Sequence, residues 1–369
     1  MPMVLMKEMK LMMLTTMHTM LKMRRKTKRK EAHNHLQEGR TETSILEAFV
    51  TRISLRELIR ATSNFSEENI IRLGKMGTMY KGVLLNGSLL AVKRFRNFQH
   101  FEKQFIYEVR TLGRLRHNNL VPLFGFCAEE EERLLVYKYM ASGNLCEWLH
   151  PLEADSKFLE WPLRVRIGIG LARGLAWLHH TCKPRVIHGN ISSNCILLDQ
   201  KFEPKLSNFG TSMILKSNDS NSHIGEAHLS ESLLNISKED VYCFGIVLLE
   251  MVTGEKPNQV SDASDNFSGT LVEWITHLWD ASRPYNAIDK LLAAQGFDGE
   301  IVQFLKVAYN CVKSSPNERP SMLEVYRILS AIGETYRIAN DSEILTGNES
   351  GIGNHRNENT RDEIIEVIK

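Results

Sequence analysis

Residues 185–210 read R-V-I-H-G-N-I-S-S-N-C-I-L-L-D-Q-K-F-E-P-K-L-S-N-F-G, and within them lie two short loops, H-G-N and N-F-G. Each loop contains an asparagine, Asn190 in the first and Asn208 in the second. An asparagine amide has nearly the shape of an aspartate carboxylate but carries no charge. It can therefore neither accept a proton as a general base nor hold a hard cation such as magnesium firmly.

The order and spacing of these residues resemble the catalytic loop and the metal loop of protein kinases, which read H-R-D and D-F-G. In that family the first Asp accepts the proton of the substrate hydroxyl, and the second holds a magnesium ion. Asn190 and Asn208 stand at these positions, and Cys195 stands where the family has its second metal ligand. General-base help is worth about a hundred- to ten-thousand-fold in rate, and a soft thiol suits magnesium poorly. The resemblance implies a kinase fold that has lost efficient phosphoryl transfer.

Other positions of the two loops divide into matches and departures. His188, Leu197 and Phe209-Gly210 keep the kinase pattern. Gly189 replaces the Arg that in many kinases reads a phosphorylated activation loop, and Ser192 replaces the Lys that steadies the transferring phosphate. Asn194 lies one place out of register and would serve as a metal ligand only if the loop shifted.

Residues 72–79, R-L-G-K-M-G-T-M, match the glycine-rich loop G-x-G-x-x-G-x-V of the same family. Arg72 takes the place of the first glycine, and Met79 takes the place of the valine that packs on adenine. Glycines allow backbone amides to approach phosphates closely. Because Gly74 and Gly77 remain, we expect the ability of this loop to cover the nucleotide phosphates to be impaired and not abolished.

The triplet Ala91-Val92-Lys93 matches V-A-I-K, which puts Lys93 where a kinase grips the first two phosphates. In the helix predicted over F-E-K-Q-F-I-Y-E-V-R-T-L, Glu108 shares a face with Phe105 and Leu112. A carboxylate on a buried face needs a cation. We therefore expect an ion pair between Lys93 and Glu108.

The resemblance also implies a nucleotide site, with Tyr137 at the back of its pocket and a hinge after it. The expected contacts of ATP are Gly74, Gly77, Met79, Ala91, Lys93, Met140 and Leu197. The expected catalytic positions are Lys93, Glu108 and Asn190, the last at a degenerate base position. Magnesium would meet only the degenerate ligands Cys195 and Asn208, so we expect its binding to be weakened.

Signals for secondary structure agree with a two-lobed α+β fold, a small β-rich lobe with one helix and a larger helical lobe. Ser54 and Glu57 form a capping box that predicts a helix to about Ala61, with a turn after it. Runs at 78–85 and 88–95, joined by Asn86-Gly87, predict a hairpin. Helices are predicted from Trp161-Pro162, from Asp240 to Val252, and over amphipathic segments at 301–312 and 322–332.

The segment from Thr211 to about Ser230 is short, polar and rich in Ser and Asn. L-S-E at 229–231 replaces the A-P-E of kinases, which puts a peptide-substrate platform in doubt. The resemblance implies that Glu231 pairs with Arg319.

The segment S-L-R-E-L-I-R-A-T-S-N-F-S at 54–66 resembles the lead-in to the kinase domain of plant receptor-like kinases. Stretches such as R-L-L-V-Y-K-Y-M and D-V-Y-C-F-G-I-V-L-L-E-M-V-T-G resemble the inactive, pseudokinase-type subgroup of leucine-rich-repeat receptor-like kinases. The resemblance covers roughly residues 53–338, the kinase domain only, and no leucine-rich repeat is visible. Such proteins bind other receptor-like kinases and regulate their signalling, at the cytoplasmic face of the plasma membrane or in the cytoplasm.

The chain has 369 residues and 43% hydrophobic residues, ample for a large core. We expect five parts: 1–47, Met-rich and basic, disordered or membrane-proximal; 48–68, a lead-in; 69–140, the β-rich lobe; 141–338, the helical lobe; and 339–369, a disordered tail. Six scattered cysteines without a C-x-x-C pair indicate neither a disulfide framework nor a zinc site. His179, His180 and Cys182 are interpreted as a helix end and not as a metal site.

Basic residues gather at the start of the chain. The first 30 residues carry a net charge of +8, against a total of +2 for the whole chain. The run from Arg24 to Lys30 fits contact with an anionic membrane at about 1 kcal/mol per basic residue, a solvated tail, or a nuclear-import signal. The apolar run from Leu11 to Leu21 is too short to span a bilayer.

Two functions remain open at this point. The first is a receptor-like pseudokinase that acts as a scaffold or regulator, with ATP as a candidate ligand and no nucleic-acid partner. The second is a weakly active Ser/Thr kinase that transfers the ATP γ-phosphate to protein with Lys93, Glu108 and a poorly held metal.

Overall fold

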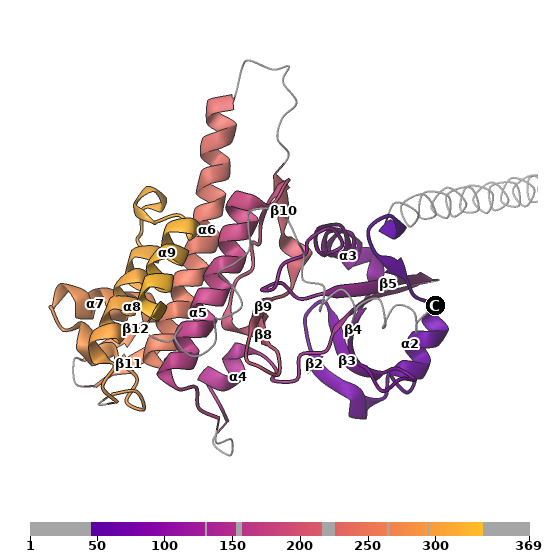
Figure 1. Ribbon diagram of the computed structural model, residues 1–369, viewed down its shortest axis with the longest axis horizontal. Helices are drawn as coiled ribbons and strands as arrows, with labels where there is room; N and C mark the ends of the chain where they lie inside the picture. The colour runs from indigo at the N-terminus through magenta and orange to yellow at the C-terminus, as the bar shows by residue number, and fades with distance from the viewer. Residues whose placement is uncertain are drawn as a thin grey trace, which may run out of the picture. The chain divides into compact units, whose positions relative to one another are not determined.

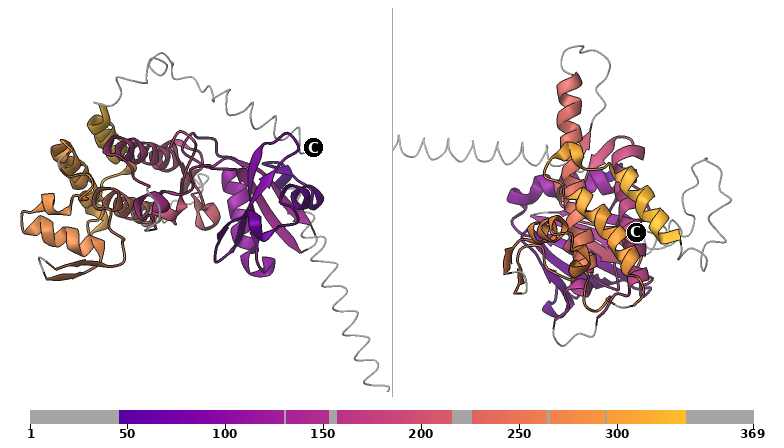
Figure 2. Two further views of the ribbon diagram at one scale, coloured as in Figure 1. Left: turned by 90° about the horizontal axis from the view of Figure 1, so that it is seen from below. Right: turned by 90° about the vertical axis from the view of Figure 1, so that its left-hand side faces the viewer.

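The computed structural model of the protein describes residues 46–129, 131–152, 157–215, 226–263, 266–293 and 295–334. Residue contacts divide the chain after Phe49, and the strands and helices named below belong to the part from Val50 onward (Figures 1 and 2). The basic run from Arg24 to Lys30 and the predicted tail from residue 339 lie outside the described residues.

Six strands form one mixed sheet, in the order β1-β5-β6-β4-β3-β2. Their bounds are β1 Thr51–Arg52, β2 Ile70–Leu73, β3 Gly77–Val83, β4 Leu89–Phe95, β5 Leu123–Glu129 and β6 Glu132–Lys138. β1 runs parallel to β5, and the other neighbours are antiparallel. Together with helix α3, Phe98–Leu112, the sheet forms the predicted β-rich lobe (Figure 1).

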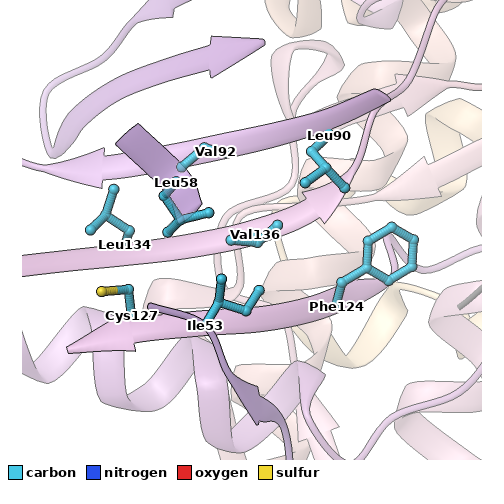
Figure 3. Close-up of a cluster of buried hydrophobic side chains, with 8 residues drawn as sticks. All are labelled: Ile53, Leu58, Leu90, Val92, Phe124, Cys127, Leu134 and Val136. Atoms are coloured by element: carbon cyan, nitrogen blue, oxygen red, sulfur yellow. The ribbon is translucent and has the colours of Figure 1, made fainter. Parts of the chain in front are cut away.

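The lead-in segment packs into this lobe through the helix α2, Leu55–Ala61. The predicted capping box is present, since the Ser54 side chain accepts a hydrogen bond from the Glu57 amide and the Glu57 carboxylate accepts one from the Ser54 amide. Figure 3 shows the apolar cluster beneath it, which consists of Ile53, Leu58, Leu90, Val92, Phe124, Cys127, Leu134 and Val136. These residues come from the lead-in and from three strands, so the lead-in contributes to the core of the lobe.

The predicted hairpin joins β3 to β4, with a longer connection than the two residues Asn86-Gly87. The Leu84 amide donates to the Ser88 carbonyl, and the Gly87 amide donates to the Leu84 carbonyl, both at 2.9 Å. Gly87 has a φ of +82°, a conformation that favours glycine. The turn residues were therefore predicted correctly, while the strands end earlier than their β-forming composition suggests.

The described part of the second lobe consists mainly of helices. Their bounds are α4 Leu145–Leu149, α5 Trp161–Ala176, α6 Glu226–Thr253, α7 Leu271–Asp280, α8 Asp298–Cys311 and α9 Met322–Ile332. Three two-stranded ribbons accompany them: β7 Arg185–Ile187 with β10 Met213–Leu215, β8 Ile196–Leu198 with β9 Pro204–Leu206, and β11 Val260–Asp262 with β12 Phe267–Gly269. Short turns of helix lie at Glu67–Asn69, Trp177–Thr181, Ser193–Cys195, Phe209–Thr211, Pro284–Ala287 and Pro316–Glu318.

Helix α6 begins at Glu226, well before the predicted start at Asp240. The family's A-P-E motif would place a proline, which breaks a helix interior, in this region. Here Leu229-Ser230-Glu231 stands instead, and neither proline nor glycine occurs between Glu226 and Phe244. The helix therefore continues through residues that in the family's pattern would interrupt it (Figure 1).

Helices α5 and α6 form the centre of this lobe, and they pack against α9 and α8 respectively. A Cβ atom on Gly245 of α6 would lie 2.6 Å from the Cβ atom of Cys311 on α8. This close approach requires glycine. In the part of the chain that the structure describes, no helix combines the length and the apolar character needed to cross a membrane.

Candidate functional site

A buried network on the β-rich lobe joins the predicted ion pair to a third residue. The Nζ atom of Lys93 on β4 lies 2.8 Å from Oε2 of Glu108 on α3. The hydroxyl of Tyr137 on β6 donates to the other carboxylate oxygen, Oε1, at 2.7 Å. Burial raises the pKa of Tyr137 well above its ordinary value, and the charge of Glu108 adds to this rise, so the hydroxyl remains a donor. Both oxygens of a fully buried carboxylate are thus satisfied.

Asp240 of α6 anchors the loop that carries Asn190. The backbone amides of His188 and Gly189 donate to the two oxygens of Asp240, at 2.7 and 2.8 Å. His179 donates to the same carboxylate at 2.9 Å. Burial acts to raise the pKa of Asp240, but the hydrogen bonds from His179 and from the Gly189 amide outweigh it and hold the pKa below its ordinary value. The loop is therefore fixed by a charged acceptor.

His188 is neutral in a definite tautomer. Its Nδ1 atom accepts from the Asn190 amide at 3.2 Å, so Nε2 carries the hydrogen and donates to the Ser207 carbonyl at 2.9 Å. Burial lowers the pKa of His188 from its ordinary value. Its ring packs edge-on against Phe209, with the ring centroids 4.6 Å apart. His188 thus links the loop of Asn190 to the loop of Asn208.

The two degenerate metal positions lie together and bond to each other. The Asn208 side-chain amide donates to the Cys195 sulfur at 3.6 Å, and the Ser192 hydroxyl donates to the same sulfur at 3.3 Å. Asn208 has a φ of +68°, in the left-handed region that Asn tolerates better than most residues. None of the three side chains is a carboxylate, the ligand that a magnesium ion prefers. Among the described residues, no three His, Cys, Asp or Glu side chains lie together in a group that could hold a metal ion.

Arg72, at the position of the first glycine, spans from the sheet to the second lobe. Its guanidinium donates to the Asn194 carbonyl at 3.1 Å and to the Asn194 side-chain oxygen at 3.0 Å. Both the backbone carbonyl and the side-chain oxygen of Asn194 are therefore held by an arginine. The bridge is exposed, so its contribution to stability is small, about 0–1 kcal/mol.

Comparisons with known proteins agree with this geometry. Residues 65–329 match the protein tyrosine and serine/threonine kinase family. The chain belongs to this family. It is 47% identical over 323 residues to a protein of Arabidopsis thaliana named "Probably inactive leucine-rich repeat receptor-like protein kinase", covering 82% of this chain and 52% of that protein.

Further relatives of this kinase-family chain include the Arabidopsis thaliana "Inactive LRR receptor-like serine/threonine-protein kinase BIR2". It is 40% identical over 305 residues, which cover 80% of this chain and 49% of that protein. The solved pseudokinase domain of BIR2, described as an immune regulator, matches with a TM-score of 0.62 and 41% identity over 77% of this chain and 85% of that chain. The chain spans about half the length of the curated relatives it matches first.

The predicted nucleotide contacts of the kinase fold lie on both lobes. On β3, Met79 pairs with Lys93 of β4, and on β4 Ala91 pairs with Tyr137 of β6. Leu197 lies on β8 in the second lobe, next to the hinge, where it bridges to Asn144. The contact of these residues with a nucleotide stays a prediction.

The glycine-rich loop and the hinge are shaped by backbone hydrogen bonds. The Gly74 amide donates to the Gly77 carbonyl at 2.9 Å, so one amide expected to face phosphates is used within the loop. A Cβ atom on Gly77 would lie 2.1 Å from the Arg94 carbonyl oxygen. The close approach of this backbone is therefore a sufficient reason for a glycine at position 77. Met140 is buried, and its carbonyl accepts from the Gly143 amide at 3.3 Å.

The pairing expected between Glu231 and Arg319 cannot be followed, because the side chain of Glu231 lies outside the described residues. The Arg319 guanidinium donates to Glu239 at 3.0 Å and to the carbonyls of Lys238, Lys313 and Ser314. Arg319 thus joins the middle of α6 to the segment after α8. His179 lies in the helical turn at the end of α5, as predicted, and its partner is Asp240.

Sequence reasoning missed three contacts of the site. Asp240 was assigned only to a helix, although a carboxylate within an apolar run is itself a signal that donors lie nearby. The bond from Tyr137 to Glu108 could have been suspected from the need of a buried carboxylate for two donors. The bridge from Arg72 to Asn194 had no signal, because it joins exposed residues 122 positions apart.

Proposed function

We propose that this chain is a receptor-like pseudokinase, a cytoplasmic scaffold or regulator that binds other receptor-like kinases and transfers phosphate inefficiently or not at all. One observation carries the proposal. The side chains of Asn208 and Cys195, the two degenerate metal positions, are hydrogen-bonded to each other, and neither is a carboxylate. The names of the relatives, inactive receptor-like kinases and a pseudokinase described as an immune regulator, support the same function.

The chemistry left to the site is binding. Asn190 cannot take a proton from a hydroxyl group, so the general base is missing as well as the charged metal ligands. Lys93 is paired with Glu108, and it remains a candidate contact for the phosphates of ATP. We propose that ATP binds as a ligand of the fold, that magnesium strengthens this binding little, and that no nucleic acid takes part.

The direct test is the melting temperature of the chain with and without ATP, each with and without magnesium. A ligand at 100 times its dissociation constant stabilises the folded state by about 2.7 kcal/mol. We expect a shift with ATP that is nearly the same in both metal conditions and disappears in Lys93→Ala. No shift in any condition would remove ATP from the proposal and leave the scaffold. A shift that requires magnesium would mean that Cys195 and Asn208 do hold a metal.

The second candidate, a weak Ser/Thr kinase, is favoured by the intact pair of Lys93 and Glu108. Its test restores the three lost groups at once, with Asn190→Asp, Cys195→Asn and Asn208→Asp. We expect the natural chain to show no phosphate transfer above that of Lys93→Ala. Transfer by the natural chain that Lys93→Ala abolishes, and that the triple variant raises steeply, would favour the weak kinase over the pseudokinase.

The membrane contact proposed for Arg24 to Lys30 needs its own assay. Sedimentation with vesicles of neutral or about 30% anionic lipid separates it from the solvated-tail interpretation, with the six basic residues of the run changed to Gln or Ser as control. Binding to anionic vesicles that the control loses is the expected result.

A further inference from the structure

A cavity of about 220 Å³ lies away from the predicted nucleotide contacts. The end of α3 and the turn after it form one wall, through Arg110, Thr111, Arg114 and Arg116. The segment after α5, including Trp177 and Lys183, forms another, and the β7–β10 ribbon closes it with Val186 and Ile214. No residue assigned above to nucleotide, metal or catalysis lines it.

The charge of the lining is one-sided. Within the described part of the chain eleven residues line the cavity; four of them are basic, Arg110, Arg114, Arg116 and Lys183, and none of these eleven is Asp or Glu. Three of them come from α3 and its end, and Lys183 comes from a segment far along the chain, so the charges converge from two sides. Such a cleft with low-dielectric walls concentrates its field on an anion.

Helix stability accounts for part of this charge. The C-terminus of a helix favours a nearby cation, and Arg116 fills that role by donating to the carbonyls of Leu112 and Leu115, at 3.1 and 2.8 Å. Arg110, in the last turn of α3, and Arg114, in the turn after it, lie at the same helix end. Lys183 comes from the segment after α5, so the end of α3 does not account for its place at the cavity.

The rest of the lining is partly apolar, and two of its residues contact side chains outside the cavity. Trp177 is stacked on His117 with ring centroids 5.1 Å apart, and the Thr111 hydroxyl is hydrogen-bonded to that of Ser212 at 3.1 Å. At about 220 Å³ the cavity is smaller than the roughly 300–1,000 Å³ of sites for drug-sized ligands. Its size suits one anionic group on a side chain and not a nucleotide.

We propose that this cavity binds a phosphorylated serine or threonine side chain presented by a partner protein. A phosphate monoester carries about −1.5 to −2 charges and three acceptor oxygens, which match a cluster of arginines. That the partner is a receptor-like kinase, which would carry such groups, rests on the proposed function. The recognition of the phosphate rests on the cavity alone.

The test uses the full chain and two fluorescent peptide mixtures, with a central phosphoserine or a central serine between random residues. We expect the phosphoserine mixture to bind at least tenfold more tightly by fluorescence polarisation. The variant Arg110→Gln with Arg114→Gln should lose this preference. The matched control, Lys103→Gln with Lys306→Gln, removes two exposed charges outside the cavity and should keep it.

Three outcomes would overturn the proposal. Equal binding of both mixtures would show that phosphate is not recognised, and an equal loss in the control variant would show general charge attraction. Displacement of the peptide by inorganic phosphate at a concentration near the peptide's own dissociation constant would show a site for free anions and not for a protein segment. None of these outcomes bears on ATP or on phosphate transfer, so the proposed function stands or falls separately. Melting of both variants within 2 °C of the natural chain confirms that they fold.

Discussion

The buried network of Lys93, Glu108 and Tyr137 can be tested by removing one oxygen atom, with Tyr137→Phe. The change leaves Oε1 of Glu108 without the hydroxyl that now lies 2.7 Å away. Glu108 is 1% exposed and Tyr137 is 4% exposed, and Phe fills nearly the same space, so water cannot take the place of the donor. Hydrogen bonds to charged groups contribute about 1.5–3 kcal/mol, and we expect a loss of about 2 kcal/mol in the free energy of unfolding.

The assay is urea unfolding of natural and variant chains at neutral pH, supported by melting temperatures. A loss of about 2 kcal/mol corresponds to roughly 4–8 °C in a domain of this size. The matched control is Tyr139→Phe, close by in the chain. Among the described residues the Tyr139 side chain makes a contact with Lys81 over its ring face, and its hydroxyl has no hydrogen-bond partner. We expect the control to change stability by less than about 0.5 kcal/mol.

The reasoning predicts a difference between the two variants and not merely a loss. If Tyr137→Phe costs less than about 0.5 kcal/mol, or no more than Tyr139→Phe, the carboxylate does not depend on its second donor. The pair of Lys93 and Glu108 would then be sufficient by itself, and the stabilising role of the Tyr137 hydroxyl would be refuted.

Three further predictions concern the loops and the pH dependence. Arg72→Gly should change the free energy of unfolding by no more than about 1 kcal/mol, because the contact between Arg72 and Asn194 is exposed. Amide hydrogen exchange at residues 192–195 should become faster, and unchanged exchange would contradict a role of this contact in holding the loop. Gly77→Ala should lower the free energy of unfolding by more than about 2 kcal/mol, since the added Cβ atom would lie 2.1 Å from the Arg94 carbonyl oxygen. Its control, Gly299→Ala in α8, has open space around the added atom and should be neutral or stabilising. Equal unfolding midpoints of the two variants in urea would contradict this prediction. Burial, aided by Arg173 and Lys205, lowers the pKa of His117 to about 4. This pKa lies below that of His117 in the unfolded chain, so protonation of His117 favours unfolding. Its effect lowers the free energy of unfolding by roughly 3 kcal/mol between about pH 6.5 and pH 4, and it is absent above that range. His117→Gln should reduce that slope in urea unfolding measured from pH 7 to 4.5, and an unaltered slope would exclude His117 as its source.

Much of the fold could be predicted because its signals are local. Ser54 and Glu57 are three residues apart, and their capping box depends on little beyond those residues. The Asn86-Gly87 turn likewise depends on the backbone freedom of one glycine. The start of α6 was predicted wrongly, because the kinase pattern suggested a break where this chain has no helix-breaking residue.

The sequence by itself determined the kinase fold, the pairing of Lys93 with Glu108 and the absence of charge at residues 190 and 208, since residue type and spacing suffice for these. Only the tertiary structure decided which partners the residues of these loops bind. It joined Asn208 to Cys195, held Asn194 with Arg72, and brought Lys183 to the arginines at the end of α3. The physical reason is that such contacts depend on how separate elements pack, and neither hydrophobic periodicity nor turn chemistry encodes the distance between side chains of different elements.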